Sequence, residues 1–248
     1  MLILNMNGIL FIVILSIVCS VSDCTQCKYA KFTSQHSGCK AANSNCEITS
    51  QTTSNAEKNT ILQLHNSMRK KVALGQETRG AQPKASDMKQ LSWDDSLAEV
   101  AKKHAEQCKF EHDCKDCRRT DNYPYVGQNI FVEFSSGDLN KNWNKVVKAW
   151  YDEVEYFSNN GVKKFTSGSG PVTGHYTQLV WGNTEKIGCG AVKYKSTRPN
   201  MKSEILYVCN YGPGGNIINS PVYTIGEPGS KCPSGFVRST EQRGLCRK

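Results

Sequence analysis

Apolar side chains recur at helical spacing in three stretches of the 248-residue chain. In the first, residues 55–74, the apolar face follows Ser54, which can cap a helix, and precedes Gly75, which can end one. The second stretch covers about 94–107 and the third about 139–157. Each places its apolar residues three or four positions apart, so we predict three helices with one face turned to a core.

Four shorter stretches are expected to be strands. Residues 127–134 look like a short strand with apolar residues at 130–132, and residues 175–181 alternate between two faces, as a half-buried strand does. Residues 188–194 and 204–211 are two further apolar runs joined by a loop, and the Gly-Pro-Gly-Gly sequence at 212–215 is expected to end the sheet in a turn. Helices on an antiparallel sheet predict an α+β fold in which helices cover both sheet faces.

The N-terminus has the pattern of a targeting signal. Residues 9–19 are an apolar run well short of the ~20 residues that a membrane span needs. Small residues at 20–22 follow it, so we expect a signal peptide over 1–22, cleavage before Asp23, and a secreted, extracellular protein without integral membrane association. A signal anchor is the alternative. The mature chain then divides into a Cys-rich arm (23–53), a main domain (54–224) and a Cys-containing tail (225–248).

Cysteine usage agrees with export. The chain has twelve cysteines, of which eleven remain after cleavage, and this density is typical of a disulfide framework. Two C-x-x-C pairs could instead hold structural zinc, but an oxidising compartment favours disulfides. Cys189 and Cys209 lie in the middle of two strands that can pair antiparallel, so we expect them to be bonded. Eleven cysteines leave one over, as a capped thiol or as the bridge of a covalent dimer; otherwise we expect a monomer.

The net charge of +9 adds attraction to acidic glycans or lipid surfaces. The basic residues are dispersed, however, and the longest basic run is only residues 69–71. Aromatic residues do not alternate with a basic stripe, as a nucleic-acid groove requires. We therefore expect no nucleic-acid partner and a solvated basic surface.

Three motifs identify a family. The sequence Gly-His-Tyr-Thr-Gln-Leu-Val-Trp at 174–181 resembles one family signature, and Tyr-Val-Cys-Asn-Tyr-Gly-Pro-Gly-Gly-Asn at 207–216 resembles a second. His65 and Asn66 with Arg69 match a third. The chain thus resembles the superfamily of cysteine-rich secretory proteins, antigen 5 and pathogenesis-related proteins (CAP). Residues 77–80, the turn at 127–129 and the N-terminal cysteines are most similar to the insect antigen-5 branch.

The resemblance implies a CAP (SCP) domain over 54–224, folded as a disulfide-stapled, three-layer α–β–α sandwich with a central antiparallel sheet and an open cleft. In the family, two histidines and two acidic residues meet on the cleft floor. Carried over, these positions are His104, Glu153 and His175, with Gln128 in place of the second acid. His104 and His175 are then candidate ligands of zinc or copper, although no cofactor is required. The alternative is that these side chains hydrogen-bond one another through water.

The resemblance also implies a disulfide pattern. Cys24 pairs with Cys39, Cys46 with Cys108, Cys232 with Cys246, and Cys27 with Cys117 or Cys114. We take Cys117 as the partner of Cys27, which makes Cys114 the odd cysteine. The tail pair is similar to that of salivary members from flies and other arthropods.

The sequence contains none of the motifs of a conventional hydrolase that we sought, neither Gly-x-Ser-x-Gly nor His-Glu-x-x-His. The resemblance favours an allergen-like venom or salivary effector, without deciding the tissue, that binds host proteins or small lipids such as eicosanoids. The alternatives are a metal-dependent enzyme, hydrolytic or redox, and a ligand that blocks a host receptor. A lipid channel would lie between the first and third helices, whose long apolar residues are Ile61, Leu64, Met68, Trp143, Val147 and Trp150.

Overall fold

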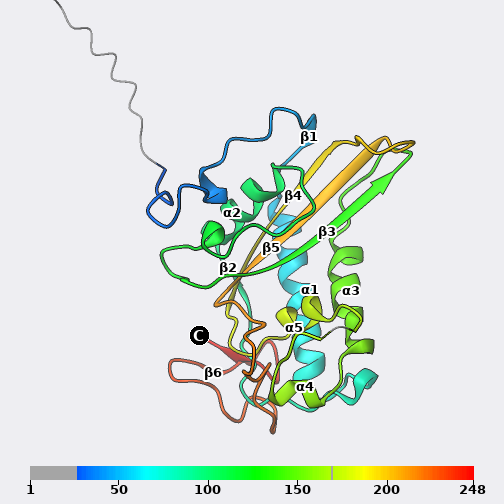
Figure 1. Cartoon of the computed structure of the whole chain (residues 1–248). Coiled ribbons are helices and arrows are strands. Elements are labelled where there is room, and N and C mark those ends of the chain that lie inside the picture. Colours follow the sequence, from blue (N-terminus) through cyan, green and yellow to red (C-terminus); the bar gives the residue numbers. More distant parts are fainter. Residues whose placement is uncertain (1–26, 169) are drawn as a thin grey trace, which may run out of the picture.

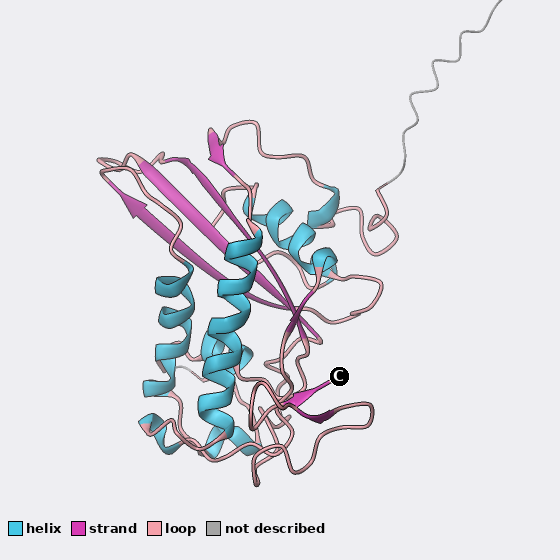
Figure 2. Cartoon of the chain, turned by 180° about the vertical axis from the view of Figure 1, so that it is seen from behind, coloured by secondary structure: helices cyan, strands magenta, loops and turns pink. Residues whose placement is uncertain are grey.

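The computed structural model of the chain describes residues 27–168 and 170–248. The expected signal peptide (1–22), its cleavage before Asp23, and Cys24 lie outside the described residues. Figures 1 and 2 show a central sheet with helices on both of its faces, so that the chain forms three layers. The expected α+β fold is confirmed.

Five strands form the main sheet. Its centre consists of β4 (Lys186–Lys195) and β5 (Ser203–Gly212), which pair antiparallel, and β3 (Gly127–Ser135) continues on the free side of β5. On the other side of β4, β1 (Ile48–Ser50) pairs antiparallel and β2 (Ser92–Trp93) pairs parallel. Since β1 comes from the segment expected to be an irregular arm, that segment is partly built into the main sheet.

The strand β5 is buried on both faces, which explains its continuous apolar sequence. Its residues Ile205 and Tyr207 belong to the core beneath α1 (Asn55–Ala73) and α3 (Trp143–Asp152). Residues Leu206 and Val208 alternate with them and pack on the opposite side against α2 (Asp95–Ala105). Alternation along one strand therefore separates the two cores of the sandwich.

Local signals set the limits of the helices. Ser54 and Glu57 form a reciprocal capping box at the start of α1, and the side chains of Asp94 and Asn142 cap α2 and α3. Gly188 lies under α2, where a Cβ atom would stand 2.2 Å from a backbone nitrogen of the helix. This glycine allows α2 to lie directly on β4.

Two predicted elements were wrong. The expected strand at 175–181 is the short helix α5 (Gly174–Leu179), and the expected third helix ends at Asp152, after which the 3-10 helix Glu153–Tyr156 follows. Residues Tyr176 to Leu179 are all buried, so α5 has no solvent-facing side to produce a helical period. A six-residue helix of this kind depends on groups from elsewhere in the chain to satisfy its ends. The minor helix α4 (Asn160–Lys163) follows after a short connection.

The structure forms five disulfides among the described residues. The pairs are Cys27–Cys39, Cys46–Cys108, Cys114–Cys117, Cys189–Cys209 and Cys232–Cys246. The second, fourth and fifth are pairs that the sequence analysis expects. Cys189 and Cys209 lie directly opposite each other on β4 and β5.

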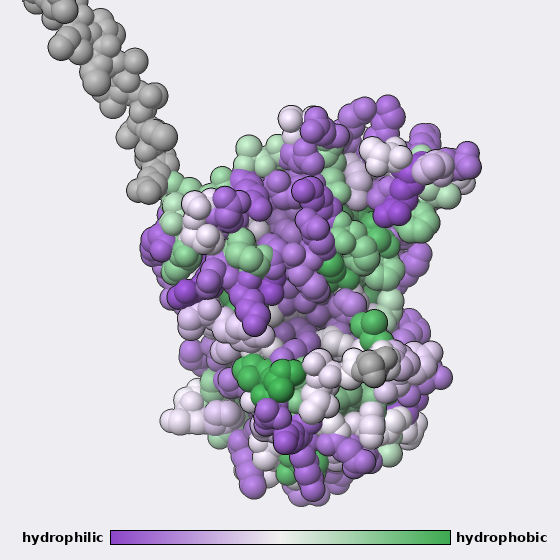
Figure 3. All heavy atoms as spheres, viewed as in Figure 1, coloured by the Kyte–Doolittle hydropathy of each residue, from purple (hydrophilic) through white to green (hydrophobic). Residues whose placement is uncertain are grey.

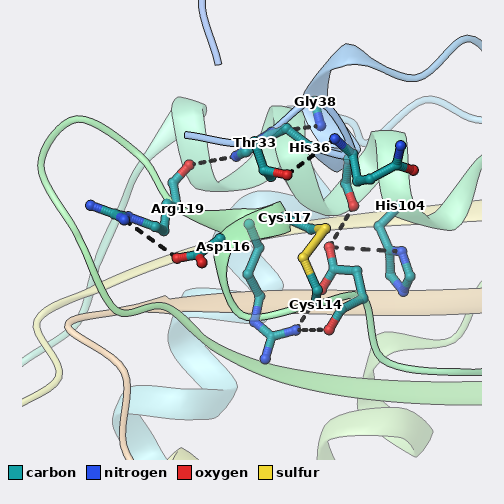
Figure 4. The surroundings of a disulfide bond; sticks show 12 residues. Thr33, His36, Gly38, His104, Cys114, Asp116, Cys117 and Arg119 are labelled. Atoms are coloured by element: carbon teal, nitrogen blue, oxygen red, sulfur yellow. Dashed lines mark hydrogen bonds and ion pairs between the residues drawn. A yellow bond between two sulfur atoms is a disulfide. The ribbon is translucent and has the colours of Figure 1, made fainter. Parts of the chain in front are cut away.

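The expected pairs Cys24–Cys39 and Cys27–Cys117 are not the ones observed. A tight turn ending in the 3-10 helix Asp116–Arg118 brings the Cα atoms of Cys114 and Cys117 to 4.9 Å, within bonding range of each other (Figure 4). Cys27 and Cys39 are likewise within range, at 5.6 Å. The odd cysteine of the expected mature chain is therefore not Cys114.

The tail folds back onto the main domain. Its two short strands, β6 (Val237–Arg238) and β7 (Cys246–Arg247), pair antiparallel, and Cys246 forms a bridge with Lys89 of the domain. Among the described helices none has the length and apolar content needed to cross a bilayer.

Candidate functional site

His175 lies at the start of α5, where the carboxylate of Glu153 holds it. Oε2 of Glu153 accepts from the backbone N–H groups of His175 (2.9 Å) and Tyr176 (3.1 Å), two of the donors that a helix start leaves unpaired. Its Oε1 lies 2.5 Å from Nδ1 of His175. One carboxylate thus caps the helix and fixes the imidazole. The indole ring of Trp150 stacks on the imidazole at 6.1 Å between centroids.

A chain of buried hydrogen bonds connects His175 to the core. Nδ2 of Asn129 donates to the carbonyl of His175 and to the hydroxyl of Tyr211, each at 3.1 Å. The Tyr211 hydroxyl in turn lies 3.0 Å from Nε2 of His65, whose Nδ1 lies 2.8 Å from the carbonyl of Ile61. His65 therefore donates through Nδ1 and accepts through Nε2. Burial lowers its pKa to about 4, so it is neutral at physiological pH.

The other end of α5 is held by Arg69, a fully buried cation of α1. Its guanidinium donates to the carbonyls of Leu179, the last residue of α5 (2.9 Å), and Trp181 (2.8 Å). It also reaches the carbonyls of Lys89 and Thr184. Burial lowers the pKa of Arg69 to about 9, and the group stays charged at neutral pH. Two of the signature positions, His65 and Arg69, thus build the support of α5.

The second imidazole of the site belongs to His112, in the loop between α2 and β3. Its Nδ1 lies 2.8 Å from Oε1 of Gln128, on β3. The amide of Gln128 has a fixed orientation, because its Nε2 donates to Oδ1 of Asn210 (3.1 Å) and its Oε1 also faces Arg118. Nδ1 of His112 therefore carries the proton.

Loss of solvent and a nearby positive charge favour the neutral form of His112. Loss of water around the ring lowers its pKa, and the nearby Arg118 lowers it further, while the bond to Gln128 and the charge of Asp113 oppose them. Asn129, the next residue of β3 after Gln128, donates to the carbonyl of His175, so both histidines contact the same end of this strand. At physiological pH the Nε2 atom of His112 then has its lone pair available.

His104, which was expected in the cleft, lies elsewhere. Figure 4 shows its ring in the Cys-rich region beside the Cys114–Cys117 turn. Its Nε2 lies 2.8 Å from the carbonyl of Glu111, and its Nδ1 lies 3.9 Å from a carboxylate oxygen of Asp113. The helical period does bury His104, as predicted, but it places the ring beneath this loop. The convergence of His104 with His175 was therefore wrong, and His112 takes the position.

Sequence patterns hardly indicate that His112 belongs to the site. It is a polar residue in an irregular Cys-rich loop, where no helical or strand period assigns a direction to a side chain. The one available signal is its position four residues after Cys108, which a disulfide attaches to the arm. Of the other expected site residues, Glu153 contacts His175, and Gln128 contacts His112.

The four side chains form two similar pairs. In each, an oxygen acceptor binds Nδ1 of an imidazole, and this selects the tautomer whose Nε2 can bind a metal. The described residues contain no group of three or more His, Cys, Asp or Glu placed to hold a metal ion. The two rings offer two imidazole nitrogens, fewer ligands than a closed structural zinc site has.

Comparison with known proteins gives one consistent result. A family model described as the cysteine-rich secretory protein family (CAP) matches residues 62–211. Venom allergen 5 of Dolichovespula arenaria is 41% identical over 83% of this chain and 96% of its own length. A CRISP/Allergen/PR-1 protein of Trittame loki is 46% identical over 83% of this chain.

Relatives differ in length from this chain. The chain spans 50% of the Trittame loki protein and 61% of a venom allergen 5 of Tityus serrulatus. Among solved structures, NaASP2 with Zn2+ matches 78% of this chain and 96% of its own with a TM-score of 0.63 and 36% identity. BmVAL-1 matches 82% of this chain and 98% of its own with a TM-score of 0.67 and 25% identity.

Proposed function

This chain belongs to the CAP family of cysteine-rich secretory proteins, and on that premise we propose that it is a secreted, venom-allergen-like effector that acts by binding and carries a divalent metal in its cleft. The metal ligands are Nε2 of His112 and Nε2 of His175. Relatives named venom allergen support the class of protein, and the solved NaASP2 structure, which contains Zn2+, supports the metal.

The observation that carries the metal proposal is the hydrogen bond at Nδ1 of each imidazole. Glu153 accepts from His175 and Gln128 accepts from His112, so both rings direct the same kind of free nitrogen outward. Imidazole nitrogen is a preferred ligand of Zn²⁺ and Cu²⁺, and an acceptor on the second nitrogen orients the ring and strengthens it as a ligand. A bound ion would supply a positive centre with open coordination positions for an oxygen or nitrogen of a partner molecule.

The hydroxyl of Thr177, in the same helix as His175, is already hydrogen-bonded within the helix and its surroundings. This favours a binding function over nucleophilic catalysis. Oγ1 of Thr177 lies 3.1 Å from the carbonyl of Thr173 and 2.7 Å from Oδ1 of Asn216. These bonds support the turn of α5, and none of them links the hydroxyl to His112 or His175. Activation of a hydroxyl nucleophile requires a base within hydrogen-bond reach. The enzyme alternative therefore lacks support from this side chain.

Calorimetric titration with zinc and copper tests the metal proposal. We expect one weak, exchangeable site per chain, and we expect its loss in a His112→Ala/His175→Ala variant. His104→Ala is the matched control, because it removes an imidazole that is already engaged with Glu111. Unchanged binding in the double variant, or loss in the control, would contradict the assignment.

Binding of small lipids stays a prediction. Of the six residues expected to line a channel between α1 and α3, Ile61, Trp143, Val147 and Trp150 are buried in the core beneath these helices. On the face shown in Figure 3, apolar atoms form small separate patches on a largely polar surface. Titration with fatty acids and leukotrienes decides the matter: no heat at micromolar protein would leave host proteins as the expected partners.

A further inference from the structure

The tail concentrates basic residues that have no acidic partner among the described residues. Lys231, Arg238, Arg243, Arg247 and Lys248 carry five positive charges within residues 225–248. No carboxylate among the described residues lies within ion-pair distance of any of them, whereas ion pairs occur over much of the remaining surface. Charges left unpaired on one segment produce a local positive field.

These charges stand on a rigid support. The disulfide Cys232–Cys246 closes the tail, and Cys246 is bound on both sides, since its N–H donates to Met88 (2.8 Å) and its carbonyl accepts from Gln90 (2.7 Å). Leu245 is fully buried in the main core. A ligand that binds here therefore meets cationic groups on a backbone that is already ordered.

The hairpin presents its arginines on opposite faces. Arg238 stands opposite Cys246 and Arg247 opposite Val237, so Arg238 and Arg247 project in different directions. Arg238, Arg243 and Lys84 line a hollow of about 560 Å³ whose one acidic residue is Glu227.

A second hollow lies on the other side of the hairpin. It measures about 220 Å³, and Lys186, Arg247 and Lys248 line it together with Glu185 and Glu241. Both hollows thus carry more positive than negative side chains, and the hairpin separates them.

We propose that this tail platform (Arg238, Arg243, Arg247 and Lys248) is a binding site for a sulfated polysaccharide. Two cationic hollows on either side of a hairpin suit an extended polyanion better than a single phosphate. In the larger hollow, Nε of Arg238 donates to the carbonyl of Gly229 (2.8 Å), which fixes the guanidinium and leaves its two terminal nitrogens for an oxyanion. The site is separate from the cleft and requires no metal.

Chromatography on immobilised heparin, with the full chain at several salt concentrations, tests the proposal. We expect Arg238→Ala/Arg243→Ala to bind about tenfold more weakly at physiological salt and to show a shallower dependence of affinity on salt, because two charge contacts are lost. The control is Lys109→Ala/Lys202→Ala, which removes two exposed charges that also lack an ion pair but lie outside the tail. Equal losses in both variants would show that net charge alone is responsible, and would overturn the site.

Three further measurements keep the result interpretable. Arg243→Ala/Lys248→Ala should also weaken binding, and it spares the bond between Arg238 and Gly229, so a folding defect of the first variant does not decide the outcome. Binding should persist in EDTA, and its loss there would assign it to the cleft. Retention on phosphatidylserine vesicles without retention on heparin would replace the polysaccharide with a lipid surface and overturn the proposal.

Discussion

The two histidines of the cleft are held by structures of different kinds. His175 rests on buried elements: a carboxylate, Glu153, accepts from its ring, and the buried cation Arg69 holds the far end of its helix. His112 lies in a surface loop, where a neutral amide, Gln128, is the acceptor. The better supported imidazole and the negatively charged acceptor are therefore both on the His175 side. We expect the His112 side to limit the affinity of the site for a metal ion.

The loop around His112 has its own supports. Asp113 forms an ion pair with Arg118 at 2.5 Å and accepts from Ser37 of the arm at the same distance. The short disulfide Cys114–Cys117 follows directly. Ser37 connects the loop to the arm, and Arg118 also donates to the carbonyl of Val126 and to Gln128 of β3. None of these contacts involves Glu153 or His175. Disturbing them should therefore leave the His175 side intact.

The largest effect is expected from Arg69→Met. Losing the cation leaves the carbonyls of Leu179, Lys89 and Thr184 without their donor, and we expect the free energy of unfolding to fall by about 4 kcal/mol. Denaturant unfolding measures this loss. A loss below about 1 kcal/mol would mean that α5 does not depend on the buried cation.

The buried His65 should make stability depend on pH. Its pKa is about 4 in the folded state and about 6.5 when unfolded, so its neutral form stabilises the fold fully above pH 6.5. This contribution, about 3 kcal/mol, is lost as the pH falls from 6.5 to 4, because the unfolded chain then takes up a proton that the folded chain does not. In His65→Gln, unfolding measured across this range should lose that part of the slope. An identical slope would assign the dependence to other groups.

Breaking the disulfide of the His112 side should cost less. Cys114→Ser/Cys117→Ser opens a loop of only four residues, for which the chain-entropy model gives about 2 kcal/mol, against about 4 kcal/mol for Cys46→Ser/Cys108→Ser. Thermal unfolding compares the two variants. Cys114→Ser/Cys117→Ser should also weaken zinc binding, because it loosens the loop that carries His112. Equal destabilisation by the two variants would show that the turn at 114–117 supports more than its own loop.

Exchanging the two acceptors should give the smallest change. Glu153→Gln removes the charge behind His175 and should weaken zinc binding about tenfold, while Gln128→Glu adds a charge behind His112 and should strengthen it about tenfold. Each change corresponds to about 1.4 kcal/mol. Titration of both variants and of the unchanged chain with zinc shows whether the charges behind His175 and His112 affect the affinity differently. Changes of the same sign would contradict the comparison.

The sequence predicted most of the fold because periodicity follows burial. Two of the three long helices and the strands at 127–134, 188–194 and 204–211 lie close to their expected limits. Failure occurred at α5, whose ends are satisfied by Glu153 and Arg69, residues distant in sequence. No local pattern contains such partners.

For the site, as for the fold, the sequence predicted the residues of regular segments better than those of irregular loops. Gln128, Glu153 and His175 lie in regular or closely supported segments, and Glu153 contacts His175. His104 was misplaced because its helical period shows that it is buried without showing against what. His112 was missed because its position depends on the loop that Asp113, Arg118 and the disulfide at 114–117 shape.

The most direct test of the cleft is the anomalous diffraction of zinc in a crystal of the full chain grown near neutral pH. We expect one peak about 2.0–2.1 Å from Nε2 of both His112 and His175, with Nδ1 of each ring still bound to Gln128 and Glu153. A peak at His104, or a zinc ion bound by His175 without His112, would contradict the account.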